Sequence, residues 1–157
     1  MRSRTIAVVA AIILGCQLLA PGTAAAAPAD TYDVRCNHGR WIRTSDYLWV
    51  FLPVNTGLDP QTSCTLRNGH NDNFGVVALQ NMLVKCYGQA NAVDGDFGPA
   101  TEQALKRAQA WEFTVNAKWQ VATNGVYNWS ATGAYVMWPY HLRSDEPDRF
   151  DCRYKTR

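Results

Sequence analysis

Beyond its first 27 residues the chain has no apolar run that approaches the roughly 20 residues of a membrane-spanning helix. It also has no excess of one charge there. Of its 15 basic residues only Arg2 and Arg4 lie in the first 27, and all 13 acidic residues come later, so 13 of each remain. Binders of nucleic acid or of anionic membranes need a basic surface, so the sequence predicts neither a nucleic-acid partner nor a membrane span.

The chain is also poor in the residues from which catalytic sites are built. It has three histidines, His38, His70 and His141, and none stands in an H-E-x-x-H pattern. A zinc hydrolase needs about three histidine or carboxylate ligands and an open position. No serine or cysteine nucleophile has a recognisable local frame either. We therefore expect no enzymatic activity, no metal and no cofactor.

Residues 1–27 have the pattern of a secretory signal peptide. A basic start precedes the apolar stretch Ile6–Ala20, and the small residues Ala24–Ala27 offer a cleavage site. This pattern predicts a secreted protein. The residues around Cys16 also resemble a lipoprotein cleavage box, so lipidation of Cys16 stays open as an alternative.

Four of the five cysteines lie beyond this leader, at Cys36, Cys64, Cys86 and Cys152. An even number in a small secreted chain indicates two disulfides. Of the three pairings we favour Cys36–Cys64 with Cys86–Cys152, because it places one bridge in the first half and ties the tail to the second. A zinc site made of all four thiolates is the alternative, which the absence of C-x-x-C spacing disfavours.

The rest of the chain divides by pattern into three parts. Residues 28–73 have strand character: Tyr47–Leu52 is aromatic and β-branched up to Pro53, and Ser63–Leu66 is a second short strand. Residues 74–138 have helical character, and residues 139–157 are a tail. We predict a mainly α protein, in which a closed three-helix bundle follows a small, irregular, disulfide-tied segment that contains strands.

Three helices are expected in the second part. Val76, Leu79, Leu83 and Tyr87 follow one helical face, with Gly88 at the position of a C-cap. A second helix should begin at Pro99, with an apolar face that includes Ala108 and Trp111 and with Glu102 and Lys106 as an i, i+4 pair. The third is expected from Ser130 to Trp138, ending at Pro139.

A turn rich in glycine separates the first two predicted helices, and a similar one follows about thirty residues later. The first contains Asp94-Gly95-Asp96-Phe97-Gly98, and the second contains Asn124-Gly125-Val126-Tyr127. In each, the glycine permits a positive φ and the Asx side chain can accept a backbone N–H. The chain thus carries two copies of a turn followed by a helix.

These residues closely resemble the type-1, three-helix peptidoglycan-binding domain. That family shows V-x-x-L-Q-x-x-L, then D-G-x-F-G-x-x-T, then A-V/L-x-x-F-Q, and then a second turn. The matching segments here are Val76–Leu83, Asp94–Thr101, Ala104–Gln109 and the start of the second turn at Asn124. The second turn departs from the pattern, since Asn124 replaces Asp and Asn128 replaces Gly. Ala108 stands where an aromatic is usual, and Trp111 or Phe113 is the candidate replacement.

The resemblance implies a compact bundle that binds peptidoglycan of the bacterial cell wall without cutting it. Sugar rings have apolar faces that stack on aromatic side chains, and peptides offer amides and carboxylates. We therefore expect the ligand between the two turns. The candidate ligand-binding residues are Asp94, Gly95, Phe97, Asn124, Tyr127 and Trp129.

Each of these residues also has a purely structural interpretation. Asp94 and Gly95 could simply form the turn, and Phe97 could belong to the core. Gln80 and Gln109 are interpreted as buried polar groups that bond the turns.

The favoured function is a secreted, extracellular or cell-wall-associated protein that binds peptidoglycan. A secreted protein–protein interaction or inhibitor module that reuses the bundle is the alternative, with a protein partner at residues 28–73. A small cell-wall hydrolase with catalytic residues in 28–73 is the least favoured.

Overall fold

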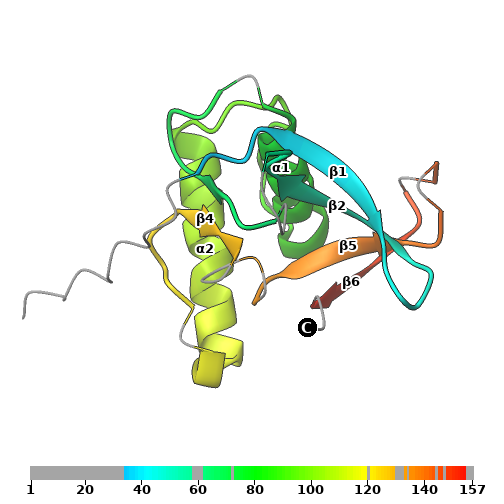
Figure 1. Cartoon of the computed structure of the whole chain (residues 1–157). Helices are drawn as coiled ribbons and strands as arrows, with labels where there is room; N and C mark the ends of the chain where they lie inside the picture. The colour runs from blue at the N-terminus through cyan, green and yellow to red at the C-terminus, as the bar shows by residue number, and fades with distance from the viewer. Residues whose placement is uncertain are drawn as a thin grey trace, which may run out of the picture.

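The computed structural model describes residues 34–57, 62–71, 73–119, 121–129, 133, 135–143, 145–146 and 148–154. The predicted signal peptide and Cys16 lie outside them. The elements in chain order are β1 (His38–Arg43), β2 (Trp49–Val54), β3 (Thr65–Leu66), α1 (Phe74–Tyr87), α2 (Pro99–Val115), a 3-10 turn (Ala117–Trp119), β4 (Tyr127–Asn128), β5 (Met137–His141) and β6 (Phe150–Tyr154). Figure 1 shows this order in colour. No helix among the described residues is long and apolar enough to cross a membrane.

Helix α1 begins and ends where local chemistry dictates. The side chain of Asn73 caps its start by accepting the N–H of Gly75 at 2.7 Å. Gly88 caps its end in the left-handed region, at φ +59°, and its N–H bonds the carbonyl of Leu83. The predicted first helix is confirmed.

Helix α2 begins with Pro99 in its first turn, as the sequence predicts. Lys106 and Glu102 form the expected i, i+4 ion pair, with Nζ 2.6 Å from Oε1. Ala108 is fully buried, whereas Trp111 and Phe113 are 46% and 49% exposed. Neither ring therefore fills the place of the usual aromatic at position 108, because both are about half exposed.

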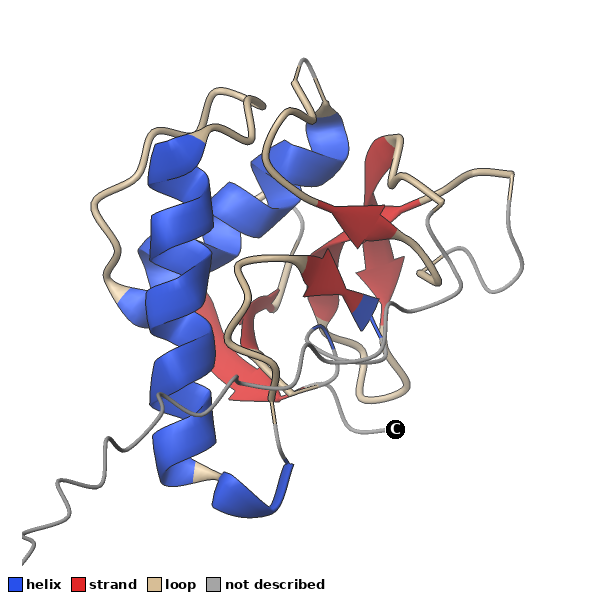
Figure 2. Cartoon of the chain, turned by 90° about the vertical axis from the view of Figure 1, so that its left-hand side faces the viewer, coloured by secondary structure: helices blue, strands red, loops and turns tan. Residues whose placement is uncertain are grey.

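A four-stranded antiparallel sheet with the order β1-β2-β5-β6 covers one side of α1. Helix α1 packs against β1, β2 and β5, and it also contacts α2. The two helices cross obliquely, with α2 along the edge of the molecule (Figure 2). A second, two-stranded sheet pairs β3 with β4.

The prediction of a mainly α, three-helix bundle is wrong. The described residues contain two α-helices and two antiparallel sheets. The predicted third helix ends in residues that form strand β5, where Trp138 pairs with Arg153 and Tyr140 with both Val50 and Asp151. The helical spacing at 131–138 was misleading, because long-range pairing with β2 and β6 decides the conformation here. Its first part, 130–132 and 134, lies outside the described residues.

Two prolines sit inside strands rather than ending them. Pro53 is the fifth residue of β2 and pairs with Gly39 of β1, so the expected strand end at Leu52 is wrong. Pro139 lies in β5, which pairs with β2 only through Tyr140 and His141. Toward β6, Pro139 pairs with Cys152, so this proline also lies within a strand.

One apolar core joins the sheet, the helices and β4. Its fully buried members come from every part of the described chain: Val50, Leu52, Leu66, Val76, Leu79, Leu83, Phe97, Leu105, Tyr127 and Trp138. Tyr127 and Trp138 meet edge to face, with ring centroids 6.0 Å apart. The sheet and the helices therefore share their hydrophobic stabilisation.

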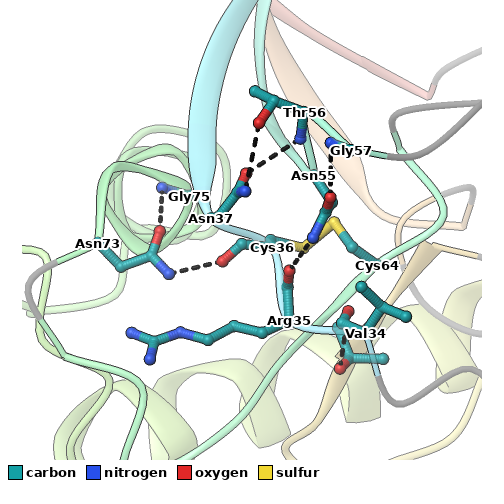
Figure 3. The surroundings of a disulfide bond; sticks show 11 residues. Val34, Arg35, Cys36, Asn37, Asn55, Thr56, Gly57, Cys64, Asn73 and Gly75 are labelled. Atoms are coloured by element: carbon teal, nitrogen blue, oxygen red, sulfur yellow. Dashed lines mark hydrogen bonds between the residues drawn. A yellow bond between two sulfur atoms is a disulfide. The ribbon is translucent and has the colours of Figure 1, made fainter.

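Two disulfides have the favoured pairing, Cys36–Cys64 and Cys86–Cys152. They close loops of 28 and 66 residues, which corresponds to about 4 kcal/mol each in the loop-entropy description. Around the first, Asn73 Nδ2 donates to the carbonyl of Cys36 at 2.6 Å (Figure 3). The helix cap thus also anchors the disulfide strand.

A buried carboxyl links α2 to the C-terminal strand. Glu112 is fully buried, and its Oε2 accepts from Tyr154 Oη at 3.0 Å and from Asn116 Nδ2 at 2.9 Å. Tyr87 of α1 donates to Oε1, and its own oxygen accepts the N–H of Met137 at 2.7 Å. Burial raises the pKa of Glu112 above its usual range, although these donors oppose the shift.

Candidate functional site

The first glycine turn is bonded mainly by one buried side chain, Gln80 of α1. Its Oε1 accepts the N–H groups of Asp94 at 3.0 Å and Gly95 at 2.9 Å. Its Nε2 donates to Asp94 Oδ1 at 2.7 Å and to the carbonyl of Asp96 at 3.1 Å. One amide therefore uses both ends to fix the turn, which matches the predicted role of Gln80.

Asp94 is exposed but its carboxylate is engaged inside the turn. Oδ1 accepts the N–H of Asp96 at 2.9 Å, the Asx geometry expected from the sequence. This backbone N–H and the amide of Gln80 lower the pKa of Asp94 below its usual range. Gly95 has φ +84°, which an L side chain rarely adopts, and its Cα faces the backbone of Asn73. The turn is thus rigid, and its outer carboxylate surface faces solvent.

Thr101 joins the same network from the first turn of α2. It is 2% exposed, and its Oγ1 lies 3.2 Å from Gln80 Nε2 and 3.3 Å from the carbonyl of Asp96. The threonine four residues after Phe97 therefore has a structural role within this chain, because it bonds both Gln80 and the turn. The sequence resemblance marked Thr101 as part of the motif, but not as a partner of Gln80.

The second turn repeats the arrangement with Gln109 of α2. Its Oε1 accepts the N–H of Gly125 at 2.8 Å, and its Nε2 donates to the carbonyl of Val126 at 2.9 Å. Asn124 Oδ1 accepts the N–H of Val126 at 2.9 Å, as Asp94 does in the first turn. The predicted role of Gln109 is confirmed, and the substitution of Asn for Asp preserves the turn.

The two turns lie along the same helix. The first is bonded through Thr101 and the second through Gln109, eight residues later, which is about 12 Å along a helix axis. A Cβ on Gly125 would lie 2.8 Å from side-chain carbons of both Glu102 and Lys106. The ion pair of α2 therefore lies directly against the second turn.

Residues 67–71 form one wall of this region. Gly69 donates its N–H to the carbonyl of Phe97 at 2.9 Å, and Phe97 donates to the carbonyl of His70 at 2.9 Å. Asn68 Nδ2 donates to Glu102 Oε2 at 2.9 Å. Sequence reasoning missed this wall, because no local pattern pairs a loop of the first half with α2.

The six predicted ligand contacts occupy different depths at these turns. Phe97 and Tyr127 are fully buried, so their rings lie beneath the turns and support them from the core. Gly95 is buried, Asp94 and Asn124 are exposed, and Trp129 is partly buried against the core. In this structure the accessible candidates are Asp94, Asn124 and Trp129. That the six residues bind a ligand stays a prediction.

Residues 74–112 match the family model described as "Putative peptidoglycan binding domain". This confirms the resemblance seen in the sequence over α1, the first turn and most of α2. The peptidoglycan-binding match thus includes Gln80, Asp94 and Gln109, and it stops before the second turn. No curated protein and no solved structure matches the chain significantly.

The peptidoglycan-binding match points to recognition of the cell wall, and the two disulfides agree with an extracellular or cell-wall location. No group of three or more His, Cys, Asp or Glu side chains in the described part of the chain is placed to hold a metal ion. What the turns offer chemically is a surface of carboxylate, amide and ammonium groups, and the partly buried Trp129 follows the second turn in the chain. Such a surface can bind a polar ligand with apolar faces.

Proposed function

We propose that the protein is secreted and binds cell-wall peptidoglycan without cutting it. The observation that carries the proposal is the peptidoglycan-binding match at 74–112, in the segment whose turn Gln80 holds rigid. The leader at residues 1–27 and the two disulfides support secretion.

The proposed contact surface runs along α2 from the first turn to the second. Its accessible members are Asp94, the Glu102–Lys106 pair, Asn124 and Trp129. Asn68 extends it on the side of residues 67–71 through its bond to Glu102. The indole of Trp129 offers a ring face to a sugar, and the polar groups offer partners to hydroxyls and peptide amides. Preformed turns lower the cost of ordering the site on binding.

A pull-down of the oxidised protein, without residues 1–27, on insoluble peptidoglycan tests the proposal. We expect the protein to sediment with the wall and no soluble sugar or peptide to be released during the incubation. Release of fragments would show a catalytic site, and protein that stays in the supernatant would favour the protein–protein alternative.

A matched pair of tryptophan variants locates the surface. Trp129→Ala should reduce the sedimented fraction, because it removes the ring beside the second turn. Trp111→Ala is the control, since Trp111 is 46% exposed and contacts Tyr87 rather than either turn. Melting curves of both variants should be recorded, because Trp129 also packs against the core. Equal binding by the two folded variants would move the surface away from the second turn.

A further inference from the structure

A cavity of about 370 Å³ lies at the end of the large sheet, apart from the glycine turns. Its volume falls in the range of small-molecule sites. Eight residues from before β2, from β5 and β6 and from the segment between β5 and β6 line it: Leu48, Tyr140, Leu142, Asp148, Arg149, Phe150, Asp151 and Arg153. All lie outside the segment that matches the peptidoglycan-binding family.

The inner wall of the cavity carries a buried phenol. Tyr140 is 6% exposed and lines the cavity. Burial first, and then the charge of Asp46, raise the pKa of Tyr140 to about 12, while Arg153 opposes the shift. The hydroxyl therefore stays protonated at neutral pH. A protonated phenol in the cavity wall can donate one hydrogen bond to a ligand and accept another.

The outer walls of the cavity are apolar and unusually exposed. Leu142 is 61% exposed and Phe150 is 38% exposed. Two side chains contact the Phe150 ring. The Lys85 Nζ lies 4.8 Å from the ring centroid, and the centroid of the His141 ring lies 5.9 Å from it. A fixed aromatic ring next to an exposed leucine provides a platform for an apolar surface of a ligand.

The charges of the residues that line the cavity cancel, and both arginines take part in ion pairs. Two arginines and two aspartates line it. Arg153 Nε lies 2.8 Å from Asp151 Oδ2, and Arg149 Nη1 lies 3.3 Å from Glu146 Oε2. The cavity therefore has no excess charge with which to select an ion, whereas its carboxylates and guanidinium groups still offer partners to neutral hydroxyl and amide groups.

We propose that this cavity binds an uncharged saccharide ring. The apolar face of the ring lies on Phe150 and Leu142, and a hydroxyl or acetamido group bonds the Tyr140 hydroxyl. The cavity is a second sugar contact, separate from the surface along α2. Only the choice of an N-acetylated amino sugar as the probe rests on the proposed function.

The test is a titration of the uniformly ¹⁵N-labelled, oxidised protein with the β-1,4-linked trimer of N-acetylglucosamine, followed by amide chemical shifts. We expect saturable shifts at Leu48, Leu142 and Phe150. Tyr140→Phe, which deletes only the hydroxyl, should raise the dissociation constant about fivefold, which is the effect of losing one hydrogen bond. Tyr47→Phe is the matched control, because Tyr47 is 72% exposed and does not line the cavity; it should leave the constant unchanged.

Three results would overturn the inference: no saturable shifts at these residues, equal affinity of Tyr140→Phe and the parent protein, or shifts at these residues with glycylglycine but not with the trimer. The wall pull-down gives an independent answer. Trimer binding at the cavity by a protein that fails to sediment with the wall would support this site and refute the proposed function. Sedimentation without any shift at the cavity would do the reverse.

Discussion

Replacing Gln80 by methionine tests whether one amide holds the first turn. Methionine keeps the length and approximate volume of the side chain but can neither accept nor donate as glutamine does. The change removes five hydrogen bonds, which involve two N–H groups, one carboxylate oxygen, one carbonyl and the hydroxyl of Thr101. It leaves the shape of the core nearly intact, so the polar contribution is isolated.

The expected loss of stability depends on which former partners of Gln80 can bond to water instead. Asp94 and Asp96 are exposed, so water can replace much of what they lose. Gly95 is buried against Asn73, and a buried N–H left without a partner costs about 1–3 kcal/mol. With about 1 kcal/mol for the exposed partners together, Gln80→Met should lower the free energy of unfolding by about 2–4 kcal/mol.

Gln109→Met provides the internal comparison. Gln109 makes two bonds to its turn, to the N–H of Gly125 and to the carbonyl of Val126, so the loss should be about 1–3 kcal/mol and smaller than for Gln80→Met. Gln103→Met, on the exposed side of α2, should change stability by less than about 0.5 kcal/mol. The assay is urea unfolding with both disulfides intact. A larger loss for Gln109→Met, or a loss at Gln80 no greater than at Gln103, would refute the reasoning.

Three further perturbations have outcomes fixed by the structure. Because folding raises the pKa of Glu112, its protonated form stabilises the fold below the unfolded-state pKa, and this stability is lost as pH rises through the folded-state pKa. Glu112→Gln should therefore gain stability relative to the parent from pH 4 to pH 7 in urea titrations. A pH-independent difference would contradict this. Dithiothreitol should reduce Cys86–Cys152 before Cys36–Cys64, because only the former is partly exposed; alkylation and mass spectrometry give the order, and the reverse order would exclude access as the cause. Gly125→Ala should cost about 1–2 kcal/mol in thermal unfolding, since φ is +74° there, and an unchanged melting temperature would show that the turn rearranges freely.

The features that the sequence predicts correctly are those set by nearby residues. Helix α1 and its glycine cap, the start of α2 at Pro99 and both Asx turns depend on contacts within a few residues. Gln80 and Gln109 bond turns that lie further along the chain. The sequence still predicts these bonds, because the motif includes both each glutamine and the turn that follows it. The disulfide pairing followed from the position of the cysteines relative to the two halves of the chain.

The features that it misses depend on partners far along the chain. Strand β5 exists because Tyr140 and His141 pair with Val50 and Trp49, some ninety residues earlier, and because β6 pairs along its other edge. Periodicity alone cannot reveal such partners, and an apolar spacing that fits a helix can also fit a buried strand. The wall at 67–71 and the cavity at the end of the sheet were missed for the same reason.

The sheet changes how the peptidoglycan-binding match should be understood. Helix α1 is buried on more than one side, with Val76, Ala78, Leu79, Met82 and Leu83 at 0–1% exposure, because α2 and the sheet both cover it. The strands that supply this cover come from residues before and after 74–112, and Cys86–Cys152 and the Glu112 contacts bind the last strand to the helices. The matched segment is therefore the scaffold of the first turn, while its stability and one wall of its candidate surface come from the flanking residues. A change in β1, β2 or β6 should consequently act on the turns through α1, although none of these strands contains a residue of the motif.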